Sequence, residues 1–207
     1  MKLAVIGATG YTGSRIRDEA LSRGHKVTAI VRNADALPTH RNLTPLALDI
    51  TDVEALTVAI AGHDAVVSAF NPGKDPSRRG MAAILAAAAK AGTLRLLVVG
   101  GAGSLEVAPG RRLVDEPDFP QQWKDGALRT SEVLETLRRS SGLNWTFISP
   151  AANLSPGDRT GTYRTGGDQL LTDAAGHSQI SVEDYAVAMI DEAETPRHPR
   201  QRFCVAR

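Results

Sequence analysis

The chain of 207 residues carries 24 basic and 23 acidic side chains, so it is long enough for one well-cored domain, and its near-neutral balance creates no global field that attracts nucleic acid or a membrane. The single cysteine, Cys204, excludes an internal disulfide framework and fits a reducing cytosol, and no apolar run approaches the roughly 20 residues that span a bilayer. We therefore expect a cytoplasmic protein with one domain, 1–207, that binds neither nucleic acid nor membrane.

The first 21 residues join an apolar run, a glycine loop and an amphipathic helix. Residues 3–6 lack polar alternation, which is typical of a strand buried on both faces, and apolar side chains recur on one face of a helix over 14–21. Between them, glycines let a pyrophosphate approach the backbone, and free N–H groups at the helix start favour an anion. The predicted dinucleotide contacts are Gly7, Thr9, Gly10, Tyr11, Thr12 and Gly13.

The glycine spacing in this loop is G-x-x-G-x-x-G, which departs from the G-x-G-x-x-G of the usual dinucleotide fingerprint. Glycines also serve structural roles in many tight turns. The prediction therefore depends on the buried strand before the loop and the amphipathic helix after it.

Arg32 follows a β-branched run over 26–31 that predicts the second strand. In dinucleotide folds an acid at this strand end binds the 2′-hydroxyl of NAD, whereas an arginine accommodates the 2′-phosphate of NADP. The acid Asp35 lies three residues further on. Arg32 therefore favours NADP(H), with NAD(H) as the second choice of cofactor; the alternative is that Arg32 is a solvated surface side chain.

Asp49 lies between a short third strand expected over 46–48 and a helix expected over 53–61, which Thr51 or Asp52 can cap. Its carboxylate can accept a hydrogen bond from the adenine amino group, with the amide of the cofactor-site residue Ile50 beside it. The alternative is a loop aspartate that only caps.

The fourth strand is expected over 65–70, where a break at 71–73 ends it. Open parallel sheets bind ligands at the carboxyl ends of their strands, so Ala69, Phe70 and Asn71 are expected beside the cofactor. An alanine-rich helix over 81–91 follows, and its small side chains predict close packing on the sheet.

A second glycine cluster ends the fifth strand, expected over 94–99. Gly100, Gly101 and Ala102 would let the backbone lie against a flat ligand. Ser104 then offers the best-placed hydroxyl for work at the nicotinamide, which makes it the candidate catalytic residue. The alternative is a serine in a flexible turn.

Residues 105–122 are rich in Pro, Gly and charge, which predicts a loop that covers the site as a lid. A helix over 127–139 and a strand over 144–148 follow. Pro150 and Ala151, at the end of that strand, complete the predicted cofactor site.

Residues 149–181 are expected to form the wall of the site on the substrate side, with hairpin-like strands within 155–178. A cap at 181–184, a helix over 185–194 and a strand over 202–206 end the pattern. Strands alternate with helices throughout, which predicts an α/β fold: a Rossmann-like, doubly wound parallel sheet in a single domain.

These motifs resemble the atypical short-chain dehydrogenase/reductase group with a GATGxTG loop, and more closely the NmrA-like, NAD(P)H-binding family and its NADH-flavin reductase subgroup. Relatives of that subgroup include flavin- and biliverdin-reducing enzymes and nitrogen-metabolite-repression regulators. The segment 159–168 is the most specific to the subgroup. The other matching residues are 7–13, 31–33, 100–104, 145–151 and 181–185.

The chain departs from typical short-chain dehydrogenases, whose Tyr-x-x-x-Lys pair lowers the tyrosine pKa for proton transfer. In an alignment with these enzymes, Trp123 stands at the tyrosine position and Ala127 at the lysine position, while Lys124 has the wrong spacing. None of the three tyrosines is followed by lysine four residues later. These departures argue against a tyrosine-based alcohol dehydrogenase.

Flavin reduction needs less machinery, because hydride passes from the nicotinamide to the flavin N5 and solvent can protonate the product. The resemblance thus implies an NAD(P)H-dependent reductase, monomeric or homodimeric, of a small planar acceptor such as a flavin or quinone. The sequence shows no metal-binding motif, so no metal is expected. The alternative is a non-catalytic NAD(P)-binding redox sensor that regulates a partner.

Overall fold

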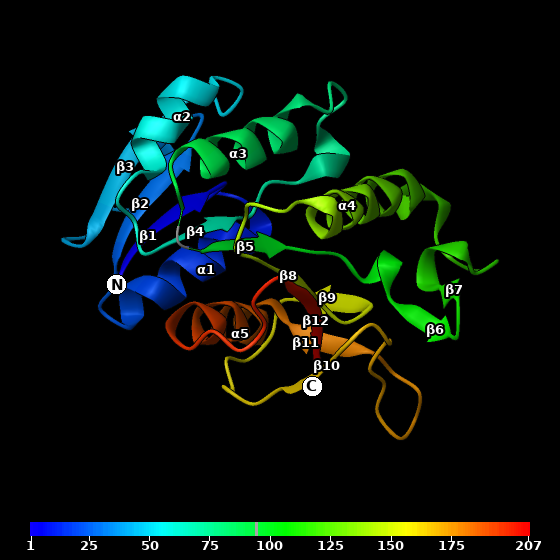
Figure 1. Cartoon of the computed structure of the whole chain (residues 1–207). Helices are drawn as coiled ribbons and strands as arrows, with labels where there is room; N and C mark the ends of the chain where they lie inside the picture. Colours follow the sequence, from blue (N-terminus) through cyan, green and yellow to red (C-terminus); the bar gives the residue numbers. More distant parts are fainter. Residues whose placement is uncertain (94) are drawn as a thin grey trace.

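The computed structural model describes residues 1–93 and 95–207, and its centre is an eight-stranded sheet with helices on both faces (Figure 1). The strand order is β10-β12-β8-β5-β4-β1-β2-β3, and every pairing is parallel except that of β10 with β12. The strands of this sheet are β1 (Lys2–Ile6), β2 (Lys26–Val31), β3 (Leu43–Ala47), β4 (Ala65–Ser68), β5 (Leu96–Val99), β8 (Trp145–Ser149), β10 (Arg164–Gly166) and β12 (Gln201–Ala206).

The helices divide between the two faces of the sheet, which confirms the Rossmann-like, doubly wound α/β prediction (Figure 1). One face carries α1 (Tyr11–Ser22) and α5 (Val182–Glu194). The other carries α2 (Val53–Ile60), α3 (Arg79–Lys90) and α4 (Gln121–Arg139). Among the described residues, none of the helices has the length and apolar character that crossing a membrane requires.

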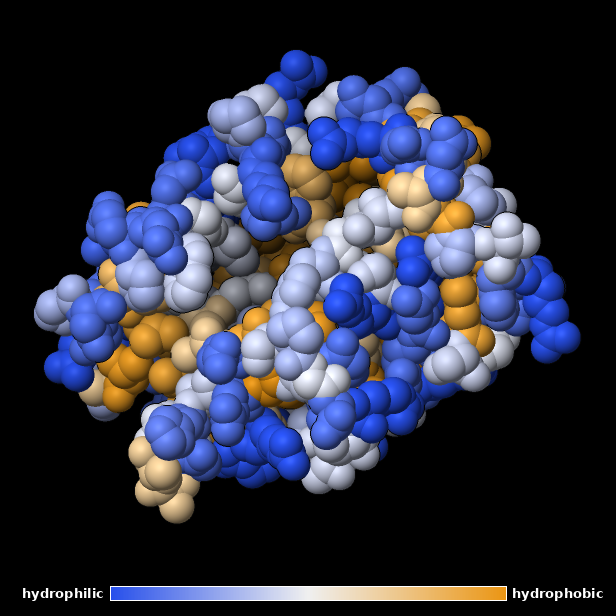
Figure 2. Space-filling model, turned by 180° about the vertical axis from the view of Figure 1, so that it is seen from behind, coloured by the Kyte–Doolittle hydropathy of each residue, from blue (hydrophilic) through white to orange (hydrophobic). Residues whose placement is uncertain are grey.

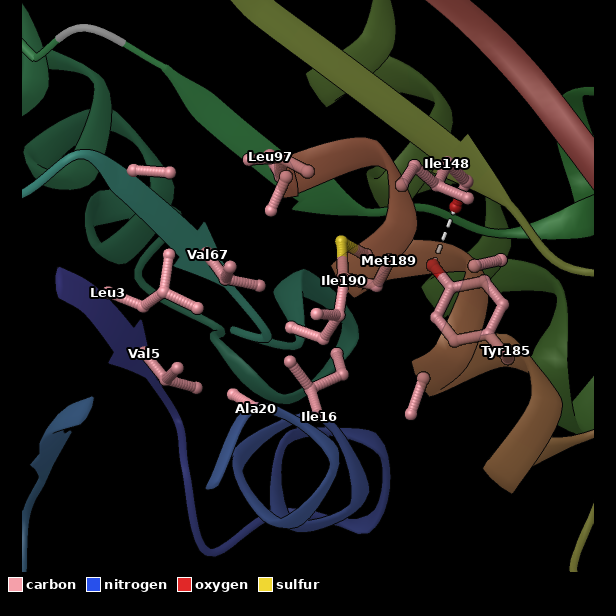
Figure 3. Packing of buried hydrophobic residues seen from close by; sticks show 14 of the residues in the cluster. Leu3, Val5, Ile16, Ala20, Val67, Leu97, Ile148, Tyr185, Met189 and Ile190 are labelled. Carbon is pink, nitrogen blue, oxygen red and sulfur yellow. Dashed lines mark hydrogen bonds between the residues drawn. The ribbon is translucent and has the colours of Figure 1, made fainter. Parts of the chain in front are cut away.

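Side-chain alternation along β1 explains its unbroken apolar run. Leu3 and Val5 point into the cluster under α1 and α5, whereas Ala4 and Ile6 point into the cluster under α2, α3 and α4. Figure 3 shows the first cluster, in which Tyr185 of α5 packs beside the strands and donates a 2.7 Å hydrogen bond to the Ile148 carbonyl. Both faces of β1 are therefore buried, as the sequence predicts.

Two strand positions differ from prediction. β3 runs over Leu43–Ala47 rather than 46–48, because Pro45 is tolerated in an edge strand. β4 ends at Ser68, so Ala69 and Phe70 follow the strand instead of belonging to it. Within the fifth predicted strand, residues 96–99 form β5, and residue 94 lies outside the described residues.

Four helices begin earlier than predicted, and one of them is α5, which begins at Val182 rather than 185. α1 begins at Tyr11 instead of 14, so the end of the glycine loop is the first helical turn. α3 begins at Arg79, two residues early. α4 begins at Gln121 rather than 127, because Pro120 supplies its N-cap position and the polar residues after it are helical in spite of their lack of an apolar face.

The predicted lid and wall contain more regular structure than expected. The lid holds a small antiparallel pair, β6 (Glu106–Ala108) and β7 (Arg111–Arg112), which turns at Gly110 with φ +72°. The prediction of hairpin-like strands within 155–178 is wrong. β9 (Asn153–Ser155) pairs in parallel with β11 (Gln179–Ser181), and β10 extends the main sheet, because long connections bring back strands that short turns do not join.

Candidate functional site

The glycine loop meets backbone so closely that side chains are excluded. A Cβ on Gly7, whose φ is +79°, would lie 2.9 Å from the Ala69 carbonyl oxygen. A Cβ on Gly13 would lie only 2.1 Å from the Gly7 carbonyl oxygen. Gly10 donates to the Gly7 carbonyl at 2.9 Å and is the N-cap of α1, where no side chain caps the first turn. The N–H groups at the start of α1 are thus left for an anion, so the residues present fit a pyrophosphate.

The parallel register gathers the other predicted cofactor residues along the same edge of the sheet. Ile6 is paired with Ile30 and with Ser68, Ser68 with Val98, and Val99 with Ile148. The residues that follow these strands therefore share the carboxyl edge of the sheet. They are Gly7, Thr9, Tyr11 and Thr12 after β1, Arg32 after β2, Asp49 and Ile50 after β3, Ala69, Phe70 and Asn71 after β4, Gly100, Gly101, Ala102 and Ser104 after β5, and Pro150 and Ala151 after β8.

Several of these residues have packing roles of their own. A Cβ on Gly100 would lie 2.4 Å from the Phe147 ring, so contact with β8 already requires this glycine. Ala151 is 3% exposed and belongs to the core. The Phe70 ring contacts Gly80 and lines a cavity of about 150 Å³ between α3 and α4. Asn71 accepts a 2.9 Å hydrogen bond from the Gly73 amide. These four residues therefore have packing or turn roles, and their contacts with the cofactor stay predictions.

Positive charge collects around Asp49 at the end expected to hold adenosine. Hydrogen bonds from the amide and hydroxyl of Thr51, both 2.9 Å, hold the pKa of the Asp49 carboxyl below its usual range, and the charges of Arg79 and Arg32 act in the same direction. Asp49 therefore closes the turn after β3, and its contact with adenine stays a prediction. Arg79, the first residue of α3, was not predicted, because its place beside β3 is set by tertiary packing and not by spacing.

Ser104 lies in a short 3-10 segment, η3 (Ala102–Ser104), where a buried arginine from β12 holds it. The Arg202 guanidinium donates to the Ser104 hydroxyl at 3.4 Å and to its carbonyl at 3.5 Å, and it pairs with Asp168 of the wall. The same guanidinium donates to the Ser149 hydroxyl at the end of β8. Arg202, which the sequence analysis did not assign to the site, thus fixes the orientation of Ser104.

Two kinds of contact hold the lid in place, namely buried side chains and backbone hydrogen bonds to the wall. Leu105 and Val114 are fully buried, and the backbone of Glu106 exchanges hydrogen bonds of 2.9 and 2.8 Å with residues 168 and 170 of the wall. Lid and wall are therefore joined to each other.

The molecule is hollowed near the middle of the face in Figure 2, with hydrophobic residues at the floor and hydrophilic residues around the rim, the form that ligand sites take.

Carboxylates of α1 and α5 hold the wall in place. Asp184, which is 1% exposed, accepts hydrogen bonds from Thr160 and from the Gly161 amide at 2.6–2.8 Å. Glu19 of α1 pairs with Arg159 of the wall through two 2.7 Å hydrogen bonds. Tyr11, beside the glycine loop, donates to the Leu154 carbonyl at 3.4 Å. The wall is thus bound to the helix that starts at the glycine loop.

The tyrosines other than Tyr11 lie in structural positions. Tyr185 is fully buried, which raises its pKa far above the usual range. Burial and a 2.6 Å hydrogen bond to Asp191 raise the pKa of Tyr163 in the same way. At the positions of the missing pair, Ala127 packs on Gly103, where an added Cβ would lie 2.8 Å from the Ala127 Cβ, and Trp123 is 62% exposed. Neither the buried Tyr185 nor the half-buried Tyr163 is suited to proton transfer.

A doubly wound sheet, a glycine loop that excludes side chains and an uncapped helix start at one sheet edge define a dinucleotide-binding α/β protein. Residues 7–196 match the model of the NAD(P)H-binding family. The chain therefore belongs to the NAD(P)H-binding family, which is an oxidoreductase family.

Full-length relatives agree with this assignment. The chain is 43% identical to the uncharacterized protein YwnB of Bacillus subtilis, over 99% of this chain and 98% of YwnB. A putative epimerase from Bacteroides thetaiotaomicron has the same fold with a TM-score of 0.94 and 42% identity, covering 99% of this chain and 96% of that protein. A putative NADH-flavin reductase from Streptococcus pneumoniae gives a TM-score of 0.84 and 37% identity, covering 100% and 99%.

Proposed function

We propose that this protein is an NADPH-dependent reductase of a small planar acceptor, a flavin or a quinone. The observation that carries the proposal is a tight glycine loop with an uncapped helix start at a sheet edge that lacks a Tyr–Lys pair: residue 123 is tryptophan and residue 127 is alanine where that pair would stand. A reduction that takes its proton from solvent is compatible with such a site. The name of the 37% identical neighbour, a putative NADH-flavin reductase, supports flavin as the acceptor and not the choice of NADPH.

The preference for NADPH rests on arginines at the adenosine end. Arg32 follows β2 at the position that meets the 2′ substituent, and Arg79 also acts on the Asp49 carboxyl from α3. A guanidinium offers paired donors to a phosphate and remains charged at every working pH. The arginine pair therefore favours the cofactor that carries the additional phosphate.

In the proposed reaction, the bound nicotinamide supplies a hydride to the acceptor, and solvent supplies the proton that completes reduction. The chain's own residues position the reactants. The glycine loop holds the pyrophosphate, the backbone after β5 forms a shelf, and the Ser104 hydroxyl, oriented by Arg202, donates a hydrogen bond at the reacting end. The lid, anchored by Leu105 and Val114, limits access of water.

The test is steady-state NADPH oxidation with FMN and a quinone as acceptors, comparing the unmutated protein with Ser104→Ala from pH 6 to 9. We expect turnover without a steep pH dependence near neutrality, and a loss in Ser104→Ala well short of the roughly 10²–10⁴-fold typical of removing a general acid. Calorimetric titration with NADPH, independent of turnover, checks that both proteins bind the nucleotide equally. A loss of a thousandfold or more would contradict the positional mechanism.

The second candidate function is a non-catalytic NADP sensor. It is favoured by the absence of a Tyr–Lys pair at residues 123 and 127, which is equally compatible with nucleotide binding without catalysis. Tight NADPH binding with no turnover of FMN or quinone would establish the sensor in place of the reductase.

A further inference from the structure

One face of α4 packs on the segments at the carboxyl edge of the sheet. The helix extends beyond these contacts toward its N-terminus at Gln121. A Cβ on Gly101 would lie 3.3 Å from Thr130, one on Gly103 2.8 Å from Ala127, and one on Gly73 2.8 Å from the Cα of Gly126. These contacts place residues 126, 127 and 130 of α4 directly on the segments that follow β4 and β5. Trp123 is the next residue of this face, at i−3 and i−4 from Gly126 and Ala127.

The Trp123 side chain is largely exposed to solvent. It is 62% exposed, although it lies only one helical turn, about 6 Å, from the point where Ala127 packs on Gly103. Gly103 belongs to the same short segment as Ser104. Helix periodicity therefore places Trp123, on a helix of 19 residues, one turn from the contact between α4 and the segment that holds Ser104.

The surroundings of Trp123 fit one flat ligand better than a protein partner. The residues one turn from Trp123 on its own face are Pro120, Gly126 and Ala127, which are small, so Trp123 has no large apolar neighbour on this face of the helix. The other exposed large hydrophobic side chains of the described residues, Met1, Tyr11 and Val58, belong to other elements. An isolated, exposed indole with two rotatable bonds is a stacking surface of low entropic cost.

We propose that Trp123 binds the acceptor by stacking its indole on the flat ring system, and so restricts the acceptor to planar aromatic molecules. This inference rests on the proposed reductase function and assigns the acceptor's binding residue. Trp123 would thereby act in substrate binding at the position where dehydrogenases of the Tyr-x-x-x-Lys kind place their proton donor.

The test uses full-length protein loaded with NADP⁺, which cannot transfer hydride, and FMN as the probe. Stacking on the indole quenches flavin emission, so we expect saturable quenching by the unmutated protein and about tenfold weaker FMN binding in Trp123→Ala. Trp123→Phe should restore binding to within a few-fold. Gln122→Ala, in the same turn, is the matched control and should bind FMN normally, and all four proteins should bind NADP⁺ alike.

Turnover with NADPH separates this inference from the proposed function. If both hold, Trp123→Ala raises the KM for FMN about tenfold and leaves kcat nearly unchanged. If Trp123→Ala has the KM and flavin quenching of the unmutated protein, the stacking role is overturned while the reductase stands. If FMN is quenched through Trp123 but never reduced, the stacking role stands and the reductase is overturned. If the unmutated protein binds neither FMN nor a quinone, both are overturned.

Discussion

The cofactor half and the acceptor half of the site are built in different ways. In the cofactor half, residues 7–13 form one continuous motif, and the hydrogen bond from Gly10 to Gly7 is local. In the acceptor half, Ser104 accepts a hydrogen bond from Arg202, which is 98 residues away in the sequence. The wall residue Arg159 donates to Glu19, which is 140 residues away. Nucleotide binding thus resides in a local motif, whereas the acceptor side depends on tertiary packing. Substitutions in the cofactor half should mainly change nucleotide affinity. Substitutions in the acceptor half should mainly change the free energy of unfolding.

The largest effect is expected from Gly10→Val. Gly10 has a backbone conformation, φ −73° and ψ 171°, that valine adopts readily, and an added Cβ would lie 3.2 Å from the Gly7 carbonyl oxygen, a looser contact than at Gly7 or Gly13, so a small shift should let the protein fold. The branched side chain would cover the N–H groups at the start of α1. Loss of two charge-assisted hydrogen bonds would weaken NADPH binding by about a hundredfold or more, as measured by calorimetry. Gly142→Val, where an added Cβ meets nothing within 4 Å, is the control. Unchanged NADPH affinity in Gly10→Val would remove the glycine loop from the site.

Arg32→Ala should erase the preference for NADPH. An arginine–phosphate contact contributes roughly 1.5–3 kcal/mol, or about ten- to a hundredfold in affinity. NADH affinity should stay nearly the same, because NADH lacks the 2′-phosphate. Competitive titration of both nucleotides measures the ratio, with Arg41→Ala as an exposed arginine control. If the unmutated protein binds NADPH and NADH equally, the assignment of Arg32 is wrong.

Arg202→Ala should act mainly on stability. The Arg202 side chain is 2% exposed, and its removal leaves Ser149 and Ser104 without a buried donor. We expect the free energy of unfolding in urea to fall by about 2 kcal/mol. NADPH affinity should stay close to normal while FMN turnover falls. Arg197→Ala, an exposed arginine in the preceding loop, should change neither. Unchanged stability together with weakened NADPH binding in Arg202→Ala would contradict the division of the site into two halves.

The smallest effect concerns Glu19 and pH. Its hydrogen bonds with Arg159, and with Arg23, lower the pKa of the Glu19 carboxyl below its ordinary 4.5. A lowered pKa in the folded state means that the ionised carboxylate stabilises the fold above pH 4.5, and that this contribution is lost as the pH falls through the folded-state pKa. Glu19→Gln should reduce stability at pH 7 by about 1 kcal/mol and flatten the loss of stability below pH 4.5. Urea unfolding at several pH values measures both; identical pH profiles would contradict the role of this pair.

The parts of the fold that were predictable from sequence are those determined by local patterns. Apolar runs locate β1, β2 and β5, and the acid Asp52 caps α2 by accepting from the Ala55 amide, as expected. The shift of β3 was not predictable, because an edge position makes Pro45 acceptable. The antiparallel β10 was also missed, because its three residues form a strand only through pairing with β12.

The same distinction applies to the site. The glycine loop was predicted because its function requires specific backbone geometry at fixed spacing. Arg202, Asp168 and Arg79 were missed, because single charged residues far apart in the sequence carry no spacing signal. Trp123 was noticed only as a departure from the dehydrogenase pattern, and its exposure gives it a second interpretation.

The most direct test of the central claim is a single turnover. Protein loaded with NADPH is mixed anaerobically with FMN, and the absorbance of the reduced nicotinamide and of the oxidised flavin are followed together. A reductase predicts that both signals decay at one rate and in equal molar amounts, faster than in the same mixture without protein. Saturated NADPH binding with flavin reduction no faster than in the protein-free mixture would contradict the account.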